Sequence, residues 1–335
     1  MINWRYCSQV FEYAVASMSI SLNGILLYLC LYKMTKSMKE YKFFLICGCV
    51  IDLLFTVLSA ISQIVVVDHG TKMIFVLESP FLPATHTSVI IATSIWCSFL
   101  YAMIINVVTQ FVNRLNIICL RNRFSMLQIL MFEFVFLCWT TAHCANIGNA
   151  CDEHDNLETS RELKKNPFFY NATLPPWIAG DTHKLGMIIQ LIDVQLIIST
   201  AYGIIFYSGW RIQRKLSEDK DILQETTIRS QKQVSRILII QAAIPVLSVI
   251  FPVGLADLLP LLNISFDYIA IFIRLTIGIT PLLNPLVVLV VIPRFRNTII
   301  RMVRLNSITA IQPTSTELTS GQTIPPRGGR LQPLD

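Results

Sequence analysis

The chain has 335 residues, of which 53% are hydrophobic and 14% are charged, and its formal net charge is +6. Soluble domains carry about 25% charged residues, so this composition excludes an ordinary soluble protein and is typical of an integral membrane protein. The basic residues gather in the connections between apolar segments, which indicates membrane orientation. We therefore expect a lipid bilayer as the surroundings and no nucleic-acid partner.

Apolar segments long enough to cross a bilayer follow one another along the chain. There are seven, at about residues 10–32, 43–67, 87–112, 126–145, 185–210, 236–260 and 268–292. A short N-terminus of residues 1–9 precedes them, and residues 293–305 form an amphipathic helix beside the membrane. Residues 306–335 are too polar to fold. The sequence thus predicts an all-α bundle of seven transmembrane helices.

Lysine and arginine residues distinguish the two sides of the membrane. They are frequent in the first, third and fifth connections and in the tail, whereas the second connection has only Lys72 and the sixth has none. This distribution places the N-terminus outside and the C-terminus inside. It predicts a multi-pass protein of the cell membrane.

Polar residues of three separate spans lie at one depth. Asn23, Asp52 and Asn284 are each eight or nine residues from the inner end of their helix. At a rise of about 1.5 Å per residue, each is about 12–14 Å from the cytoplasmic boundary. We interpret them as a hydrogen-bonded cluster that holds waters or a sodium ion, beside a helix that Pro285 allows to bend. The alternative is three unrelated polar residues, each facing a neighbouring helix. No other cofactor is expected.

Charged and aromatic residues in the outer half of the bundle predict a ligand site, because a charge within lipid must face protein or water. Arg274 lies in the last span, with Asp193 and Asp257 of the two preceding spans as its expected counter-ions. Together with Trp96 and Tyr101, these residues should line a cavity open to the outside. An ion pair that only locks the bundle explains Arg274 equally well.

Arginines at the cytoplasmic ends of the helices allow two interpretations. Arg114 ends the third span, and its side chain either reaches lipid headgroups or faces a signalling partner. In the second case Arg121, Arg211 and Arg214 would share that surface. The residues alone favour the headgroup interpretation for Arg114.

The sixth span is the one expected to bend. It contains Pro245 and Pro252, and each proline removes a backbone hydrogen bond of the helix.

The outer loops carry two modification signals. Asn171-Ala-Thr is an N-glycosylation sequon. One disulfide among the cysteines near the outer side is plausible, either Cys144–Cys151 or Cys7 with one of these.

The sequence has no arrangement that suits catalysis or a metal. Its five histidines are scattered, and it has neither a glycine-rich phosphate loop nor a His-x-x-x-His pair. We therefore expect no enzyme activity and no metal centre.

The order of these features resembles the rhodopsin-like G-protein-coupled receptors, with Val288 departing from their usual tyrosine. The chain is more similar to the nematode serpentine chemoreceptors of the str-type superfamily (classes str, d, h, i and j), of which class d looks nearest. The residues that carry this similarity are Lys39-Glu40-Tyr41-Lys42, Ile240-Gln241-Ala-Ala-Ile-Pro245, Asn284-Pro285 and Pro293-Arg294-Phe295-Arg296.

This resemblance implies a receptor that binds an external small molecule or peptide and activates a heterotrimeric G protein. It also implies a place in sensory neurons, where the cilium would carry the receptor. The competing interpretation is a transporter or ligand-gated channel for a small solute. The chain has no internal repeat of the kind common in transporters.

Overall fold

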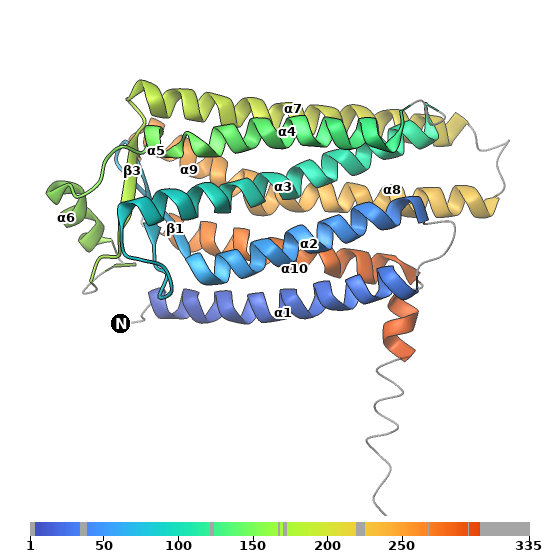
Figure 1. Ribbon diagram of the computed structural model, residues 1–335, viewed down its shortest axis with the longest axis horizontal. Helices are drawn as coiled ribbons and strands as arrows, with labels where there is room; N and C mark the ends of the chain where they lie inside the picture. The colour runs from blue at the N-terminus through green and yellow to red at the C-terminus, as the bar shows by residue number, and fades with distance from the viewer. Residues whose placement is uncertain are drawn as a thin grey trace, which may run out of the picture.

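The computed structural model describes residues 4–33, 39–120, 124–166, 168–169, 173–218, 225–264, 266, 268–293 and 295–301. Seven helices in these ranges are long and apolar enough to cross a membrane, namely 4–32, 42–62, 86–118, 126–150, 185–218, 234–261 and 269–291. They lie side by side along one direction (Figure 1). The predicted seven-helix membrane fold is confirmed.

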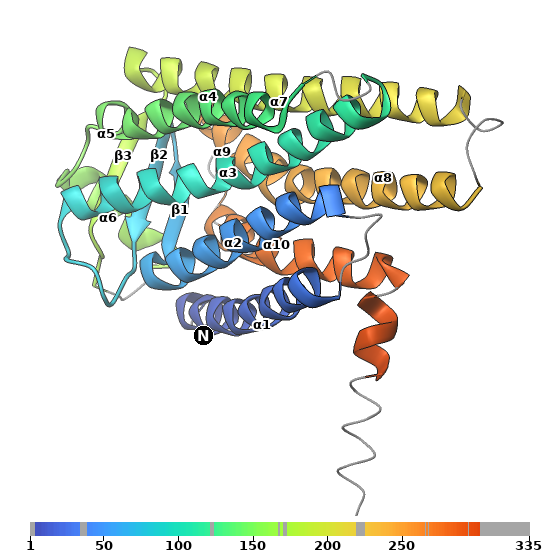
Figure 2. The ribbon, with the colours of Figure 1, turned by 45° about the vertical axis from the view of Figure 1, so that its right-hand side comes forward.

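The helices of the bundle have the following bounds. They are α1 (Trp4–Tyr32), α2 (Lys39–Ser62), α3 (His86–Ile118), α4 (Met126–Ala145) with the one-turn α5 (Ile147–Ala150), α7 (Leu185–Glu218), α8 (Glu225–Pro245), α9 (Phe251–Leu261) and α10 (Ile269–Val291). Helix α3 packs against α2, α4 and α7, whereas α1 packs against α2 and α10. Residues 295–301 are helical, and this segment turns away from the bundle direction (Figure 2).

The sixth span is irregular where the prolines predict a bend. A π-helix, η3 (Val246–Ile250), follows directly after Pro245 and joins α8 to α9. Side chains bond the backbone here, since Tyr202 Oη donates to the carbonyl of Ala242 at 3.1 Å and Ser248 Oγ donates to that of Ile244 at 2.8 Å. Thr280 Oγ1 of α10 in turn donates to Ser248 Oγ at 2.7 Å. These bonds tie the irregular turn to two neighbouring helices.

A three-stranded antiparallel sheet, which the sequence analysis did not predict, lies at one end of the bundle. Its strands are β1 (Ile64–His69), β2 (Lys72–Leu77) and β3 (Trp177–Asp181), in the order β1-β2-β3. The second predicted span ran to residue 67, but the helix ends at Ser62 and Gln63 takes a left-handed φ of 47°. Gly70, with φ 57°, turns the chain into β2. The outer boundary of that span is corrected accordingly.

The sheet is covered on both faces. Ile64, Val66 and Met73 belong to the apolar cluster of the outer half of the bundle, which includes Phe55 and Val89. On the opposite face, Val65, Val67, Ile74 and Val76 pack with Phe169 and with Leu163 of α6 (Leu157–Lys165). The sheet therefore closes the end of the bundle and is itself covered from outside by α6.

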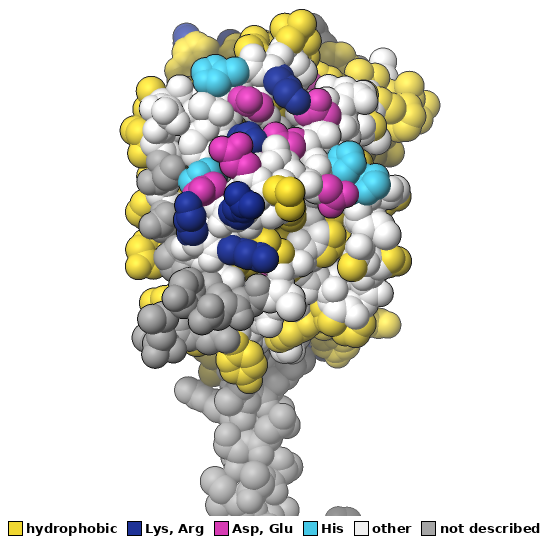
Figure 3. Space-filling view, turned by 90° about the vertical axis from the view of Figure 1, so that its left-hand side faces the viewer, with side chains coloured by type: hydrophobic (Ala, Val, Ile, Leu, Met, Phe, Trp, Pro, Cys, Tyr) yellow, Lys and Arg dark blue, Asp and Glu magenta, His cyan; other side chains and the backbone are white. Residues whose placement is uncertain are grey.

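The surface of this end carries charged side chains of both signs, whereas apolar side chains surround it (Figure 3). Lys72 pairs with Glu153 at 2.6 Å, and Lys184 pairs with Asp152 at 2.7 Å. The N-terminal end of α1 also lies here, and residues 295–301 lie at the other end (Figure 1). A charged cap on an apolar bundle matches the predicted outer side of the membrane.

Candidate functional site

A cavity of ≈ 110 Å³ lies between the sheet and the outer halves of the helices. Val66, Met73 and Phe75 of the sheet close it from outside, and side chains of α3, α7, α9 and α10 form its walls. Its lining is largely apolar. Apolar cavities of about 150 Å³ in other proteins bind molecules such as benzene. The space therefore suits a small organic molecule.

Helix α3 supplies the aromatic wall of the cavity. The helix starts after Thr85, whose side chain accepts a hydrogen bond from the Ser88 amide. Trp96 and Tyr101 both line the cavity, and each side chain is held by a polar partner. Trp96 Nε1 donates to Ser59 Oγ at 3.1 Å, and Tyr101 Oη bonds His143 Nε2 at 3.2 Å.

His143 was missed by the sequence analysis. It lines the cavity near the end of α4, where its backbone carbonyl accepts a hydrogen bond from Gln190 Nε2 at 3.1 Å. Asp193 bonds the other ring nitrogen at 2.7 Å and also accepts from Trp139 Nε1 at 3.1 Å. Asp193 thus fixes the ring of His143 instead of lining the cavity. In the predicted spans His143 lies two residues from the outer end and Asp193 eight, so depth did not link them. The observed span runs to residue 150, and this extension brings the two residues level.

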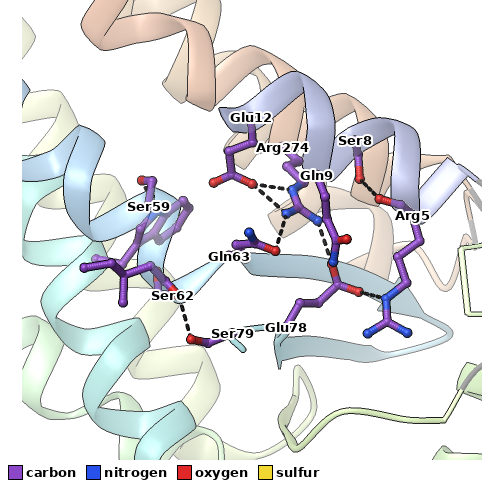
Figure 4. A network of polar contacts seen from close by, with 12 residues as sticks. Arg5, Ser8, Gln9, Glu12, Ser59, Ser62, Gln63, Glu78, Ser79 and Arg274 are labelled. Carbon is purple, nitrogen blue, oxygen red and sulfur yellow. Dashed lines mark hydrogen bonds and ion pairs between the residues drawn. The ribbon is translucent and has the colours of Figure 1, made fainter. Parts of the chain in front are cut away.

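Arg274 does not pair with Asp193 or Asp257, so the predicted counter-ions are wrong. Its Nη2 lies 2.6 Å from Glu12 Oε2 of α1, and its Nη1 lies 2.7 Å from Glu78 Oε2, just after β2. Arg5 Nε pairs with the second oxygen of Glu78 at 2.6 Å (Figure 4). We call Arg5, Glu12, Glu78 and Arg274 the outer ion cluster. It lies outside the cavity, which Asp257 does line.

The midplane residues meet in two separate contacts. Asn284 Nδ2 donates to both carboxylate oxygens of Asp52, at 3.2 and 3.3 Å. Asn23 Nδ2 donates to the Pro281 carbonyl at 3.0 Å, as does Ser19 Oγ at 3.1 Å. Pro285 has no N–H to bond that carbonyl, so side chains of α1 take its place. Asn23 therefore bonds the carbonyl that Pro285 leaves free in α10 and does not bond Asp52.

A second cavity, of ≈ 20 Å³, adjoins Asp52. Asn106, Gln110 and Asn284 also line it, and each has a buried side-chain oxygen with no hydrogen-bond partner. Gly48 makes room there, since a Cβ at this position would lie 2.9 Å from Asn106 Nδ2. About 10–15 Å³ suffices for one water molecule. The donor set of one carboxylate and three amide oxygens fits a small hard cation such as sodium.

Residues 8–300 match the family described as "Serpentine type 7TM GPCR chemoreceptor Str". The chain belongs to this receptor family. Serpentine receptor class r-10 of Caenorhabditis elegans is 29% identical over 103 residues, which are 31% of this chain and 30% of that receptor. The matched part thus spans less than a third of that relative. The predicted resemblance to str-type receptors is confirmed, and the placement nearest to class d stays a prediction.

Squid rhodopsin has the same overall fold as this Str receptor. The two structures superpose with a TM-score of 0.55 and 16% identity, over 95% of this chain and 93% of the rhodopsin. At this identity the likeness supports the fold alone.

The arginines predicted at the cytoplasmic ends of the helices differ in their exposure to solvent. Arg114 is 8% exposed, so its side chain lies inside the bundle and the headgroup interpretation is wrong. Arg211 and Arg214 are exposed on α7, where Arg214 Nε bonds Glu218 at 3.0 Å. Arg121 lies outside the described residues, as does the sequon residue Asn171.

The predicted disulfides of the receptor are absent from the described residues. Cys144 and Cys151 are buried free thiols, and Cys7 is an exposed one. Cys144 belongs to the outer apolar cluster, and Cys151 lines the cavity. Cys151 packs closely against the sheet. A Cβ added at Gly180 of β3 would lie 3.1 Å from the Cys151 Sγ.

We expect Arg274→Gln to destabilise the receptor by about 3–5 kcal/mol, because Glu12 would stay buried without a cation and Glu78 would keep only Arg5. Thermal unfolding of the purified protein measures this. Arg214→Gln is the matched control, since that arginine pairs at the surface, and it should change the midpoint little. Equal midpoints for the two variants would contradict a structural role of the outer ion cluster.

Proposed function

We propose that this receptor binds a small external molecule in the cavity beneath the sheet and activates a heterotrimeric G protein from its inner face. The observation that carries the proposal is the apolar cavity with Trp96, Tyr101, His143 and Asp257 in its lining. The sheet covers this cavity from outside, which favours a small molecule over a peptide. A few polar groups in an apolar cavity are typical of sites that orient a small ligand.

A chain of contacts leads from this cavity to the midplane. Val249 of η3 and Ile277 of α10 line the cavity. The Thr280–Ser248 hydrogen bond joins the same two elements one turn further in, and Asn284 of α10 then bonds Asp52 of α2. A ligand that fits one arrangement of η3 and α10 better than another would shift the receptor toward that arrangement. The π-helix η3 in the sixth span and the two prolines inside α10 support such a movement.

The inner face supplies the G-protein surface in this proposal. Arg211 and Arg214 present exposed cations at the end of α7, and Arg114 lies buried near the end of α3. Arg121, which the sequence predicts for the same surface, lies outside the described residues. We place the receptor in the cell membrane of a sensory neuron, with its cilium as the site of use.

The midplane site takes a sodium ion in this proposal. Asp52 and the unpartnered oxygens of Asn106, Gln110 and Asn284 would coordinate it. Because Asn284 lies on α10 beside Pro285, movement of this helix would change the ion's surroundings.

The cavity is tested by filling it. Ala256 lines the cavity and is 2% exposed, so Ala256→Leu should place three more carbon atoms in the ligand's space. In a screen of small odorants, agonist-stimulated nucleotide exchange on added G protein should be lost while unliganded exchange is retained. Ala243→Leu, at an exposed position of the same span, is the control and should respond as wild type does. A full response from Ala256→Leu would contradict the ligand site.

The sodium proposal is tested by Asp52→Asn, which removes the charge and keeps the shape. For the wild type, replacing choline chloride with sodium chloride at constant ionic strength should shift the agonist dose–response curve. The shift should vanish in Asp52→Asn and persist in Glu133→Gln, a carboxylate of α4 that does not line this site. A wild-type curve that is the same in both salts would show that the midplane residues only pack.

A further inference from the structure

Two buried carboxylates face each other where the sheet meets the bundle. Asp68 of β1 is 2% exposed, and Asp257 of α9 is 8% exposed. Both oxygens of Asp68 and the Oδ2 oxygen of Asp257 have no hydrogen-bond partner, while Gln195 donates to the Asp257 carboxyl. Strand β1 packs directly against α9. Among the described residues, neither carboxylate has an ion-pair partner.

The strand geometry places Asp68 beside the cavity. Side chains two residues apart in a strand point to the same face, so Asp68 shares its face with Ile64 and Val66. The residue that pairs with Asp68 across the sheet is Met73. Val66, Met73 and Asp257 all line the cavity. The two carboxylates therefore lie at the outer end of the cavity, beneath the sheet.

Keeping both carboxylates ionised in this arrangement costs free energy, because both are buried. Burial, together with the nearby charge of Asp257, raises the pKa of Asp68 to about 8. A buried carboxylate needs a proton, a cation or hydrogen-bond donors to offset the loss of water. The pair has three acceptor oxygens unused, which is the number of donors on a primary ammonium group.

We propose that Asp68 and Asp257 bind the ammonium group of a small organic amine whose apolar part fills the cavity. This rests on the proposed ligand function of the cavity and names its ligand class. Within the described residues no group of three or more His, Cys, Asp and Glu is placed to hold a metal ion. A bare metal ion would not explain why the rest of the cavity is apolar. An organic ammonium ion with an apolar chain explains both the carboxylates and the apolar lining.

The test compares two probes with one carbon skeleton, isoamylamine and isoamyl alcohol, on the purified full chain in lipid nanodiscs. Binding is followed by calorimetry at neutral pH. The variants are Asp68→Asn and Asp257→Asn, which keep side-chain shape, and Glu133→Gln is the matched control. We expect wild type and control to bind the amine more tightly than the alcohol. Each Asn variant should weaken amine binding at least about tenfold, since a charge-assisted bond is lost, and change alcohol binding little.

Three results would overturn the proposal. They are no binding of isoamylamine to the wild type, equal weakening of both probes in the Asn variants, or amine binding unchanged by either substitution. Retained alcohol binding shows that a variant is folded. If the amine preference is absent but the alcohol binds and Ala256→Leu blocks it, the ligand class is wrong and the cavity function stands. If Ala256→Leu has no effect on any probe, the cavity function itself fails.

Discussion

The outer half of this receptor depends on one requirement, the neutralisation of Arg274. A guanidinium that is 6% exposed must have anions beside it, and they come from two distant parts of the chain. Glu12 belongs to α1, and Glu78 follows β2. The pairing therefore joins the last helix to the first and anchors the sheet to both. Because the sheet closes the cavity, the position of the proposed ligand site depends on this ion cluster.

Prolines set the second constraint, since each leaves a backbone carbonyl without its usual partner. In α10 the Pro281 carbonyl, which Pro285 cannot bond, is taken by Ser19 and Asn23 of α1. These side-chain hydrogen bonds can change partners more readily than the backbone hydrogen bonds of a regular helix. The Pro281–Pro285 turn of α10 lies between the cavity and Asp52, which is where a ligand signal would have to pass.

Depth along a helix could be read from the sequence, and this is why the seven spans and the Asp52–Asn284 contact were predictable. The same counting fails once the chain leaves the helix. Residues 63–67 are as apolar as a helix end, so hydropathy could not separate β1 from the second span. Glu78 lies in a connection and has no helical depth, so it was not considered for Arg274. Asn23 shares the depth of Asp52 but bonds Pro281, because depth does not fix which way a side chain points.

Residues 64–77 form a folded cover over the cavity that we propose binds the ligand. Hydrogen–deuterium exchange of the receptor in nanodiscs measures this directly. The account predicts slow exchange of the β2 amides, because β2 pairs with β1 on one side and β3 on the other and both faces of the sheet are buried. Complete exchange of residues 64–77 at the earliest time, as in a solvent-exposed loop, would contradict it.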